Sequence, residues 1–288
     1  MSAPGETCPD VRAALDWAGE HLARAGVAEP RRDARLLLGE VMGGGIGTVV
    51  GHPERMLDAA QWKGFWAAVA RRAAREPVSR ILGRREFWSL EFQVTPATLD
   101  PRPDSETLVQ AVLDRIPDRA APIELLDLGT GTGCLLLALL SELPQATGLG
   151  VDIDPAAVAV ARENATRLGL ARRAVLRSGD WLDGLSGTWQ VIVSNPPYII
   201  ERDLRGLAPE VVRYDPPRAL SGGADGLAAY RRLIPQAVKH LAARGLLALE
   251  VGADQAEHVE CLIAAAGLVP SGRASDLAGI DRCVLATR

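Results

Sequence analysis

The sequence predicts an α/β fold in which a small N-terminal helical domain precedes a seven-stranded, mostly parallel sheet. From residue 123 onward, short apolar runs alternate with helical patterns, as in parallel sheets that helices cover on both faces. Residues 1–78 show helical periodicity alone, and residues 81–95 change to the aromatic and β-branched composition of a hairpin. The predicted hairpin therefore joins the two domains.

The composition argues against several classes of protein, namely nucleic-acid-binding, secreted and membrane-spanning proteins. The 288 residues are enough for two domains with sizeable cores, and a net charge of −4 argues against a broad surface for binding nucleic acid. The four cysteines have neither close pairing nor metal-ligand spacing, which is typical of a reduced cytoplasm. We expect no secretion signal and no membrane-spanning segment, because the chain has no apolar run long enough.

Three helices are expected in the N-terminal domain. The first carries apolar residues at helical spacing from Val11 to Leu22 and stops at Gly26. The second runs from Pro30 to Val41, and the third contains Leu57 to Val69 and ends before Pro77. Three arginines near its end, Arg71, Arg72 and Arg75, are interpreted as a solvated helix face.

The segment from Thr95 to Glu106 contains three prolines, which prevent a helix before Asp104. We expect Asp104 to cap the following helix and the rigid segment to form one wall of a site, unless it is an ordinary linker. The predicted boundaries are 1–78 for the helical domain, 79–98 for the hairpin linker and 99–288 for the sheet domain. The expected strands of the sheet are 123–128, 147–151, 174–177, 190–193, 245–251, 268–273 and 282–286.

A glycine-rich loop follows the first of these strands. Gly129-Thr130-Gly131-Thr132-Gly133 lets the backbone approach a ligand, and the next helix adds N–H dipoles at its start. The loop lacks both the Gly-x-Gly-x-x-Gly dinucleotide spacing, since position 134 is Cys, and the Lys of a phosphate-binding P-loop. Alone it is weak evidence for a nucleotide site.

Acidic residues follow the next two strands. Asp152 could accept hydrogen bonds from both hydroxyls of a ribose, while Asp154 is the better candidate to cap the helix that starts at Pro155. After the third strand, Asp180 could accept from an adenine amino group with Trp181 beside the ring. The alternative for this pair is a core tryptophan next to a turn aspartate.

The fourth strand ends in Ser194-Asn195-Pro196-Pro197-Tyr198. The prolines force the chain out of the sheet, which places an amide, a rigid backbone and an aromatic ring where open α/β sheets bind ligands. A stiff loop without a function is the alternative. Two N–H groups of a planar amide would need two acceptors, and Asn195 Oδ1 and the Pro196 carbonyl could supply them.

Four features follow one another along the chain: the glycine-rich loop, the acidic end of the second strand, the Asp-Trp pair and the Asn-Pro-Pro-Tyr turn. In this order they resemble class I S-adenosylmethionine-dependent methyltransferases. The turn resembles the subset of these enzymes that methylates planar nitrogens. That resemblance implies a Rossmann-like sheet, S-adenosylmethionine as cofactor, S-adenosylhomocysteine as product, and no metal. It implies cofactor contacts from Gly129 to Gly133, Asp152, Asp180, Trp181 and Asn195. It also implies catalysis by Asn195, Pro196 and Tyr198, with Pro197 among the substrate contacts.

Further stretches narrow the resemblance to the peptide chain release factor glutamine N5-methyltransferases. They are Arg31–Leu38, Arg85-Glu86-Phe87-Trp88, Pro101–Glu106, Tyr214–Leu220 and Ala278-Gly279-Ile280-Asp281-Arg282. The resemblance covers nearly the whole chain and implies methylation of the glutamine in the Gly-Gly-Gln motif of class-1 release factors, with the helical domain recognising the substrate. Two positions depart from the family pattern: Asp100 replaces an apolar residue and Ser105 replaces Thr.

Two alternatives remain. An adenine or guanine N-methyltransferase would share the Asn-Pro-Pro-Tyr turn, but the composition shows no basic surface. A cofactor-binding regulatory protein would not need that turn. The chain is therefore expected to be a cytoplasmic, monomeric enzyme whose partner is a release factor rather than nucleic acid or a membrane.

Overall fold

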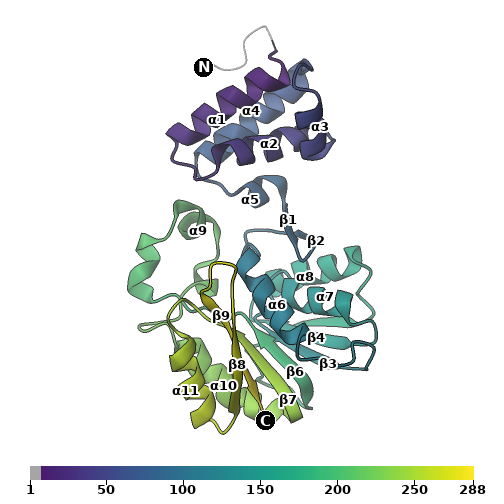
Figure 1. Cartoon of the computed structure of the whole chain (residues 1–288), viewed down its shortest axis with the longest axis vertical. Helices are drawn as coiled ribbons and strands as arrows, with labels where there is room; N and C mark the ends of the chain where they lie inside the picture. The colour runs from purple at the N-terminus through teal and green to yellow at the C-terminus, as the bar shows by residue number, and fades with distance from the viewer. Residues whose placement is uncertain (1–7) are drawn as a thin grey trace. The chain divides into compact units, whose positions relative to one another are not determined.

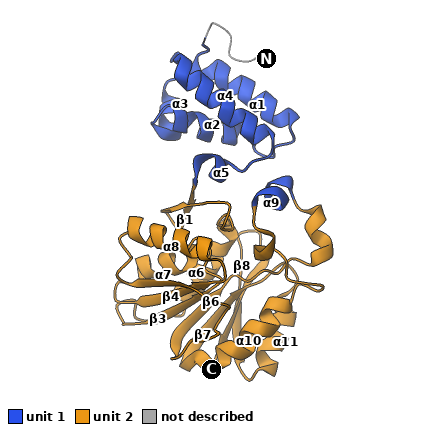
Figure 2. Cartoon of the chain, turned by 180° about the vertical axis from the view of Figure 1, so that it is seen from behind, with its two compact units in different colours: residues 1–83, 208–214 blue, residues 84–207, 215–288 orange. Residues whose placement is uncertain are grey.

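The structure is a computed structural model that describes residues 8–288; residues 1–7, the start of the predicted helical domain, lie outside the described residues. The chain forms two compact units (Figures 1 and 2). The helical unit comprises Met1–Gly83 together with Ala208–Tyr214, and the sheet unit comprises Arg84–Leu207 and Asp215–Arg288. None of the helices in the described part of the chain is both long enough and apolar enough to cross a membrane.

The helical unit confirms the three predicted helices and adds three shorter ones. Its helices are α1 (Val11–Arg24), α2 (Pro30–Val41), α3 (Gly45–Gly51), α4 (Ala59–Ala73), α5 (Val78–Leu82) and α9 (Pro209–Tyr214). The Asp10 side chain accepts from the Ala13 amide at the start of α1, and Asp58 forms a capping box with Gln61 at the start of α4. Trp62 and Phe65 are buried in the core of this unit. α3 was not predicted, because its glycines indicate a helix end rather than a helix.

Of the three arginines near the end of α4, Arg71 is exposed as the sequence predicts, but Arg72 and Arg75 are not. Arg72 is buried, and its guanidinium donates to Asp33 of α2 at 2.7 Å and to Glu210 of α9 at 3.0 Å. Arg75 binds both oxygens of the same Glu210 carboxylate at 2.7 Å. A buried arginine needs such partners, and one of them lies 138 residues away in the sequence, where no local pattern can reveal it.

The sheet unit contains the predicted seven strands in the order β5-β4-β3-β6-β7-β9-β8, with β9 antiparallel to both of its neighbours (Figure 1). The strands are β3 (Glu124–Leu128), β4 (Thr147–Asp152), β5 (Ala174–Ser178), β6 (Trp189–Ser194), β7 (Leu241–Glu250), β8 (Val269–Ser275) and β9 (Asp281–Thr287). The helices that cover them are α6 (Glu106–Leu113), α7 (Cys134–Glu142), α8 (Pro155–Arg167), α10 (Ala228–His240) and α11 (Ala256–Ala265).

Side chains alternate between the two faces of this sheet, so each face has its own core. Leu125 and Val193 pack on the face covered by α6, α7 and α8, while Leu126 and Ile192 pack on the face covered by α10 and α11. The predicted Rossmann-like α/β sheet is therefore confirmed, and both faces are dry, as parallel strands require.

The hairpin of β1 (Arg84–Phe87) and β2 (Leu90–Gln93) belongs to the sheet unit. Phe87 and Phe92 are buried in the core of that unit. The Asn164 side chain also accepts from the Gln93 amide at 2.8 Å and donates to the carbonyls of Gln93 and Thr132. The contacts divide the chain after Gly83.

The segment after the hairpin contains a short 3-10 helix, η1 (Pro103–Ser105), and then α6. Asp104 does not cap α6 as predicted: it lies inside η1 and pairs with Arg282 at 3.3 Å. Asp100 is buried and its carboxylate lies 3.9 Å from Arg85. The nearby Arg102 pairs with the buried carboxylate of Asp215 at 2.5 Å. The departure at Asp100 is thus accommodated in a group of opposite charges.

Acid should weaken the helical unit through Glu210. Burial acts to raise the pKa of Glu210, but hydrogen bonds from Arg75, the backbone and Arg72 outweigh burial and lower the pKa to about 2. A carboxylate with a lowered folded-state pKa stabilises the fold above its ordinary pKa of 4.5, and this contribution disappears as the pH falls toward 2. Glu210→Gln should cost about 1.5–3 kcal/mol at neutral pH.

Urea unfolding followed by tryptophan fluorescence measures this effect, since Trp17 and Trp62 lie in the affected core. The difference between the wild type and Glu210→Gln should shrink below about pH 4.5. Glu20→Gln is the control, because Glu20 forms only an exposed pair with Arg24. A Glu210 effect as small as that of Glu20 would contradict the prediction.

Candidate active site

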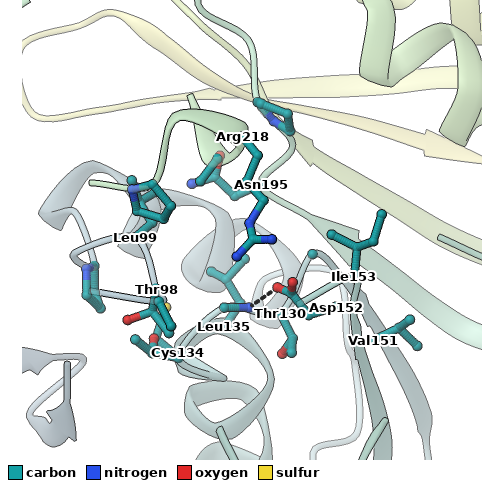
Figure 3. A pocket seen from close by; sticks show the side chains of 18 of the residues that line it. Thr98, Leu99, Thr130, Cys134, Leu135, Val151, Asp152, Ile153, Asn195 and Arg218 are labelled. Carbon is teal, nitrogen blue, oxygen red and sulfur yellow. Dashed lines mark hydrogen bonds between the residues drawn. The ribbon is translucent and has the colours of Figure 1, made fainter. Parts of the chain in front are cut away.

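A cavity of about 340 Å³ lies in the sheet unit at the carboxyl ends of β3, β4, β5 and β6 (Figure 3). Its walls come from the loops that follow these strands and from the proline-rich segment before α6, which confirms that this segment forms one wall. The lining residues that the argument uses are Thr98, Leu99, Arg102, Ser105, Gly129, Thr130, Gly131, Thr132, Asp152, Asp180, Trp181, Asn195, Pro197, Arg218 and Arg232. The volume is in the range of small-ligand sites.

The glycine-rich loop requires its glycines. Gly129 and Gly131 have φ values of 75° and 55°, which other residues rarely adopt. The amides of Gly129 and Thr130 donate to the Val151 carbonyl at 2.8 and 3.0 Å, so the loop is tied to the end of β4. A Cβ on Gly131 would meet no atom within 4 Å, which leaves the backbone open to a ligand.

Asp127 supports this loop from below. It is fully buried, and its Oδ2 accepts from the Thr130 hydroxyl at 2.6 Å, while Oδ1 has no partner among the described residues. Burial raises the pKa of Asp127 to about 7. The charge of Asp152 also raises this pKa, whereas the hydrogen bond from Thr130 lowers it. Through its hydrogen bond with Thr130, Asp127 holds the glycine-rich loop in place.

Asp152 lies on the cavity where β4 ends, as the sequence predicts. One carboxylate oxygen accepts from the Gly131 amide at 2.8 Å and the other from the Asp154 amide at 2.9 Å, so the side chain is held in place. Asp154 caps α8 by accepting from the Ala156 amide, and Arg218 pairs with it across the mouth of the cavity. Each Asp152 oxygen retains a lone pair for a ribose hydroxyl.

The acidic residue after β5 has a partner that the sequence does not reveal. The Asp180 carboxylate accepts from Arg232 of α10 at 2.8 Å. Trp181 lies on the cavity with a left-handed backbone (φ 51°), and its ring would lie 3.7 Å from a Cβ on Gly129. The ring therefore forms a wall of the cavity beside the glycine-rich loop, which suits a flat ligand group.

The Asn-Pro-Pro-Tyr turn begins where β6 ends. Asn195 and Pro197 line the cavity, and Asn195 Nδ2 donates to the Ser105 hydroxyl at 3.2 Å. Tyr198 is anchored beside it: its carbonyl accepts from Gln255 at 2.9 Å, and its ring packs against the core beneath α10 and α11. Burial raises the pKa of the Tyr198 hydroxyl to about 12, so it stays protonated at neutral pH.

The cavity brings together most of the predicted site residues, including Gly129 to Thr132, Asp152, Asp180, Trp181 and Asn195. Gly133, Pro196 and Tyr198 do not line it. Sequence reasoning missed Arg218 and Arg232. The Pro-Pro-Arg stretch at 216–218 could have indicated Arg218, whereas Arg232 lies in an ordinary helical pattern without any signal.

Two family models match the chain. The model described as PrmC N-terminal domain matches residues 13–83, and the model described as methyltransferase small domain matches residues 103–213. The first match ends where the helical unit's first segment ends.

Curated relatives cover almost the full length. The release factor glutamine methyltransferase of Rhodospirillum rubrum is 50% identical over 274 residues, which cover 95% of this chain and 84% of the relative. The enzyme of the same name from Caulobacter vibrioides is 46% identical and covers 94% of both chains. Among solved structures, the hMettl16 catalytic domain aligns with a TM-score of 0.58 at 17% identity and covers 76% of this chain and 81% of its own. At that identity the structural likeness shows the fold alone.

Asp152 provides a direct test of the site. Asp152→Ala should weaken the binding of S-adenosylmethionine, the cofactor that the sequence resemblance implies, by about 1.5–3 kcal/mol, the scale of hydrogen bonds to a charged group. Isothermal calorimetry measures the affinity. Asp183→Ala is the control, because Asp183 is exposed in the loop that follows β5 and does not line the cavity. Equal affinities for both variants and the wild type would remove Asp152 from the site.

Proposed function

Because the chain belongs to the release factor glutamine methyltransferase family, we propose that it methylates the side-chain amide nitrogen (N5) of the glutamine in the Gly-Gly-Gln motif of class-1 peptide chain release factors, with S-adenosylmethionine as methyl donor. The observation that carries this proposal is the position of Asn195, which lies on the same cavity as the glycine-rich loop and Asp152. A planar amide and a nucleoside cofactor could therefore meet there.

The residues around the cavity fit this cofactor. Asp152 would accept from the ribose, the open backbone of Gly129 to Thr132 would face the methionine part, and Trp181 would flank the adenine. Asp180 could bind the adenine amino group only by sharing its carboxylate with Arg232. Bound S-adenosylmethionine supplies a methyl group attached to a positively charged sulfur. This sulfur is a good leaving group, so the methyl group needs no further activation.

The protein must then orient a weak nucleophile. An amide nitrogen is unreactive because its lone pair is delocalised into the carbonyl group. The Asn195 Oδ1 and the Pro196 carbonyl would accept the two N–H bonds of the glutamine, which fixes its nitrogen and directs its lone pair toward the methyl. Orientation of this kind supplies much of the rate of a bimolecular transfer. Tyr198 would support the planar group of the substrate through its ring.

We also propose that the helical unit binds the release factor away from the reacting glutamine, and that the enzyme acts in the cytoplasm as a monomer. The match of residues 13–83 to the N-terminal model of this family supports a dedicated role for the unit. The net charge of −4 favours a protein substrate over nucleic acid, whose phosphates attract basic surfaces.

The function is tested by incubating the full-length protein with labelled S-adenosylmethionine and intact release factor, followed by mass spectrometry. One methyl group should appear on the Gly-Gly-Gln glutamine, and a release factor with that glutamine replaced should remain unlabelled. A short Gly-Gly-Gln peptide should be a poorer substrate by kcat/KM, since it cannot contact the helical unit. Label in DNA or RNA, or in the glutamine-free factor, would support the nucleotide-base alternative or another target instead.

Asn195 should be essential for the rate. Asn195→Ala removes one of two acceptors and should lower kcat by about 10²–10³, by analogy with the loss of one preorganised partner in an oxyanion hole. Gln190→Ala is a matched control, because Gln190 is an amide at the opposite end of the same strand. Steady-state methylation kinetics distinguish the two variants. A wild-type rate for Asn195→Ala would exclude this mechanism.

A further inference from the structure

Glu250 is a buried carboxyl group that the mechanism above does not use. It is the last residue of β7 and is 2% exposed. Leu249 pairs with Ser194 in the register between β7 and β6. Glu250 and Asn195 each follow that pair by one residue, so they leave neighbouring strands at the same edge of the sheet.

The carboxyl group of Glu250 lies close enough to the side chains of Asn195 and Ser105 to interact with both. Glu250 interacts with the Ser105 hydroxyl and the Asn195 side chain, and both interactions act to lower its pKa, while Asn195 Nδ2 donates to the Ser105 hydroxyl at 3.2 Å. Oε2 of Glu250 is buried and has no hydrogen-bond partner among the described residues. The Tyr230 hydroxyl binds only the Glu250 backbone carbonyl, at 2.8 Å. The carboxylate is thus available to the Asn195 amide rather than used in an ion pair.

We propose that Glu250, together with Ser105, is a positioning residue that holds the Asn195 amide with its NH₂ group inward and its Oδ1 toward the substrate. This inference rests on the proposed function, because it concerns how the same asparagine meets the glutamine amide.

The chemistry of an amide explains why such a device is needed. A rotation of 180° about the last side-chain bond of Asn exchanges its oxygen for its NH₂ group, and only the oxygen can accept from the N–H groups of glutamine. An ionised carboxylate only accepts, so it binds the NH₂ group and rejects the oxygen. Donation from Nδ2 to the carboxylate would also polarise the amide and strengthen Oδ1 as an acceptor.

This selection depends on the charge of Glu250. Burial raises its pKa to about 7, against the lowering effects of Ser105, Arg282 and Asn195, while Asp104 raises it further. The other titratable groups that interact with it, Cys134, Tyr198, Tyr230 and Cys283, all have pKa values raised by burial and stay protonated at neutral pH. A protonated Glu250 can donate as well as accept, and then no longer selects one orientation of Asn195.

The pH dependence of Glu250→Gln, an isosteric change, tests the proposal in the full-length enzyme. With release factor as substrate, kcat of the variant should be about tenfold lower than that of the wild type above pH 8, as for a weakened preorganised contact. The ratio should approach one below about pH 6, where the wild-type carboxyl is protonated. KM and the calorimetric affinity for S-adenosylmethionine should stay within about twofold of the wild type, since Glu250 does not line the cavity.

Two further comparisons isolate the carboxylate. Tyr230→Phe removes the neighbouring hydroxyl, which contacts only the Glu250 backbone, and should leave kcat unchanged. Ser105→Ala should lower kcat, whereas Ser105→Thr keeps the hydroxyl and should restore it. This pair tests the same contact even if Glu250→Gln does not fold.

The outcomes are distinct. A wild-type enzyme that leaves release factor unmethylated overturns the proposed function itself. If the wild type methylates release factor and Glu250→Gln has the same kcat and pH profile, only the positioning role of Glu250 is overturned. An effect confined to KM or to cofactor affinity, or Ser105→Thr as impaired as Ser105→Ala, also overturns it.

Discussion

The parallel pairing of β3 with β4 and β6 is the constraint on which the site depends. Residues Leu125 to Leu128 of β3 are all buried, and they pair with residues of both neighbouring strands. Because parallel strands in register end at one edge, the glycine-rich loop, Asp152 and Asn195 line one cavity, although Asn195 lies 66 positions after Gly129 in the sequence. The apolar cores on the two faces of the sheet therefore do more than stabilise the fold: they place the polar groups of the cavity.

The sequence was sufficient to predict this arrangement wherever a signal is local. The strands β3, β4 and β6 are short and largely apolar, and Asp152, Trp181 and Asn195 lie at or just after strand ends, so their place on the cavity could be predicted from their positions. Asp154 was correctly expected to cap α8, because a cap depends only on its own turn. The short helices α3 and α5 were missed, since glycine and length both weaken their pattern.

The side-chain contacts that could not be predicted involve partners distant in sequence. Arg72 resembles any exposed arginine on α4 until Asp33 and Glu210 are placed beside it. Arg218 and Arg232 reach the cavity from segments that follow the Asn-Pro-Pro-Tyr turn, and each pairs with an aspartate of another loop. Asp104 shows the converse: its local pattern fits a cap, but its charge serves a pair with Arg282. Periodicity reports which residues are apolar, whereas these contacts depend on tertiary structure.

The helical unit consists of two chain segments that lie far apart in the sequence, and this limits how the gene can be divided. Glu210, which neutralises Arg72 and Arg75, is encoded within the catalytic part of the chain. A fusion that transfers only residues 1–83 to another protein would leave a buried arginine with one of its two acidic partners. The N-terminal module and the segment that carries α9 must therefore be inherited together, and an exchange of the helical unit requires two matched segments instead of one.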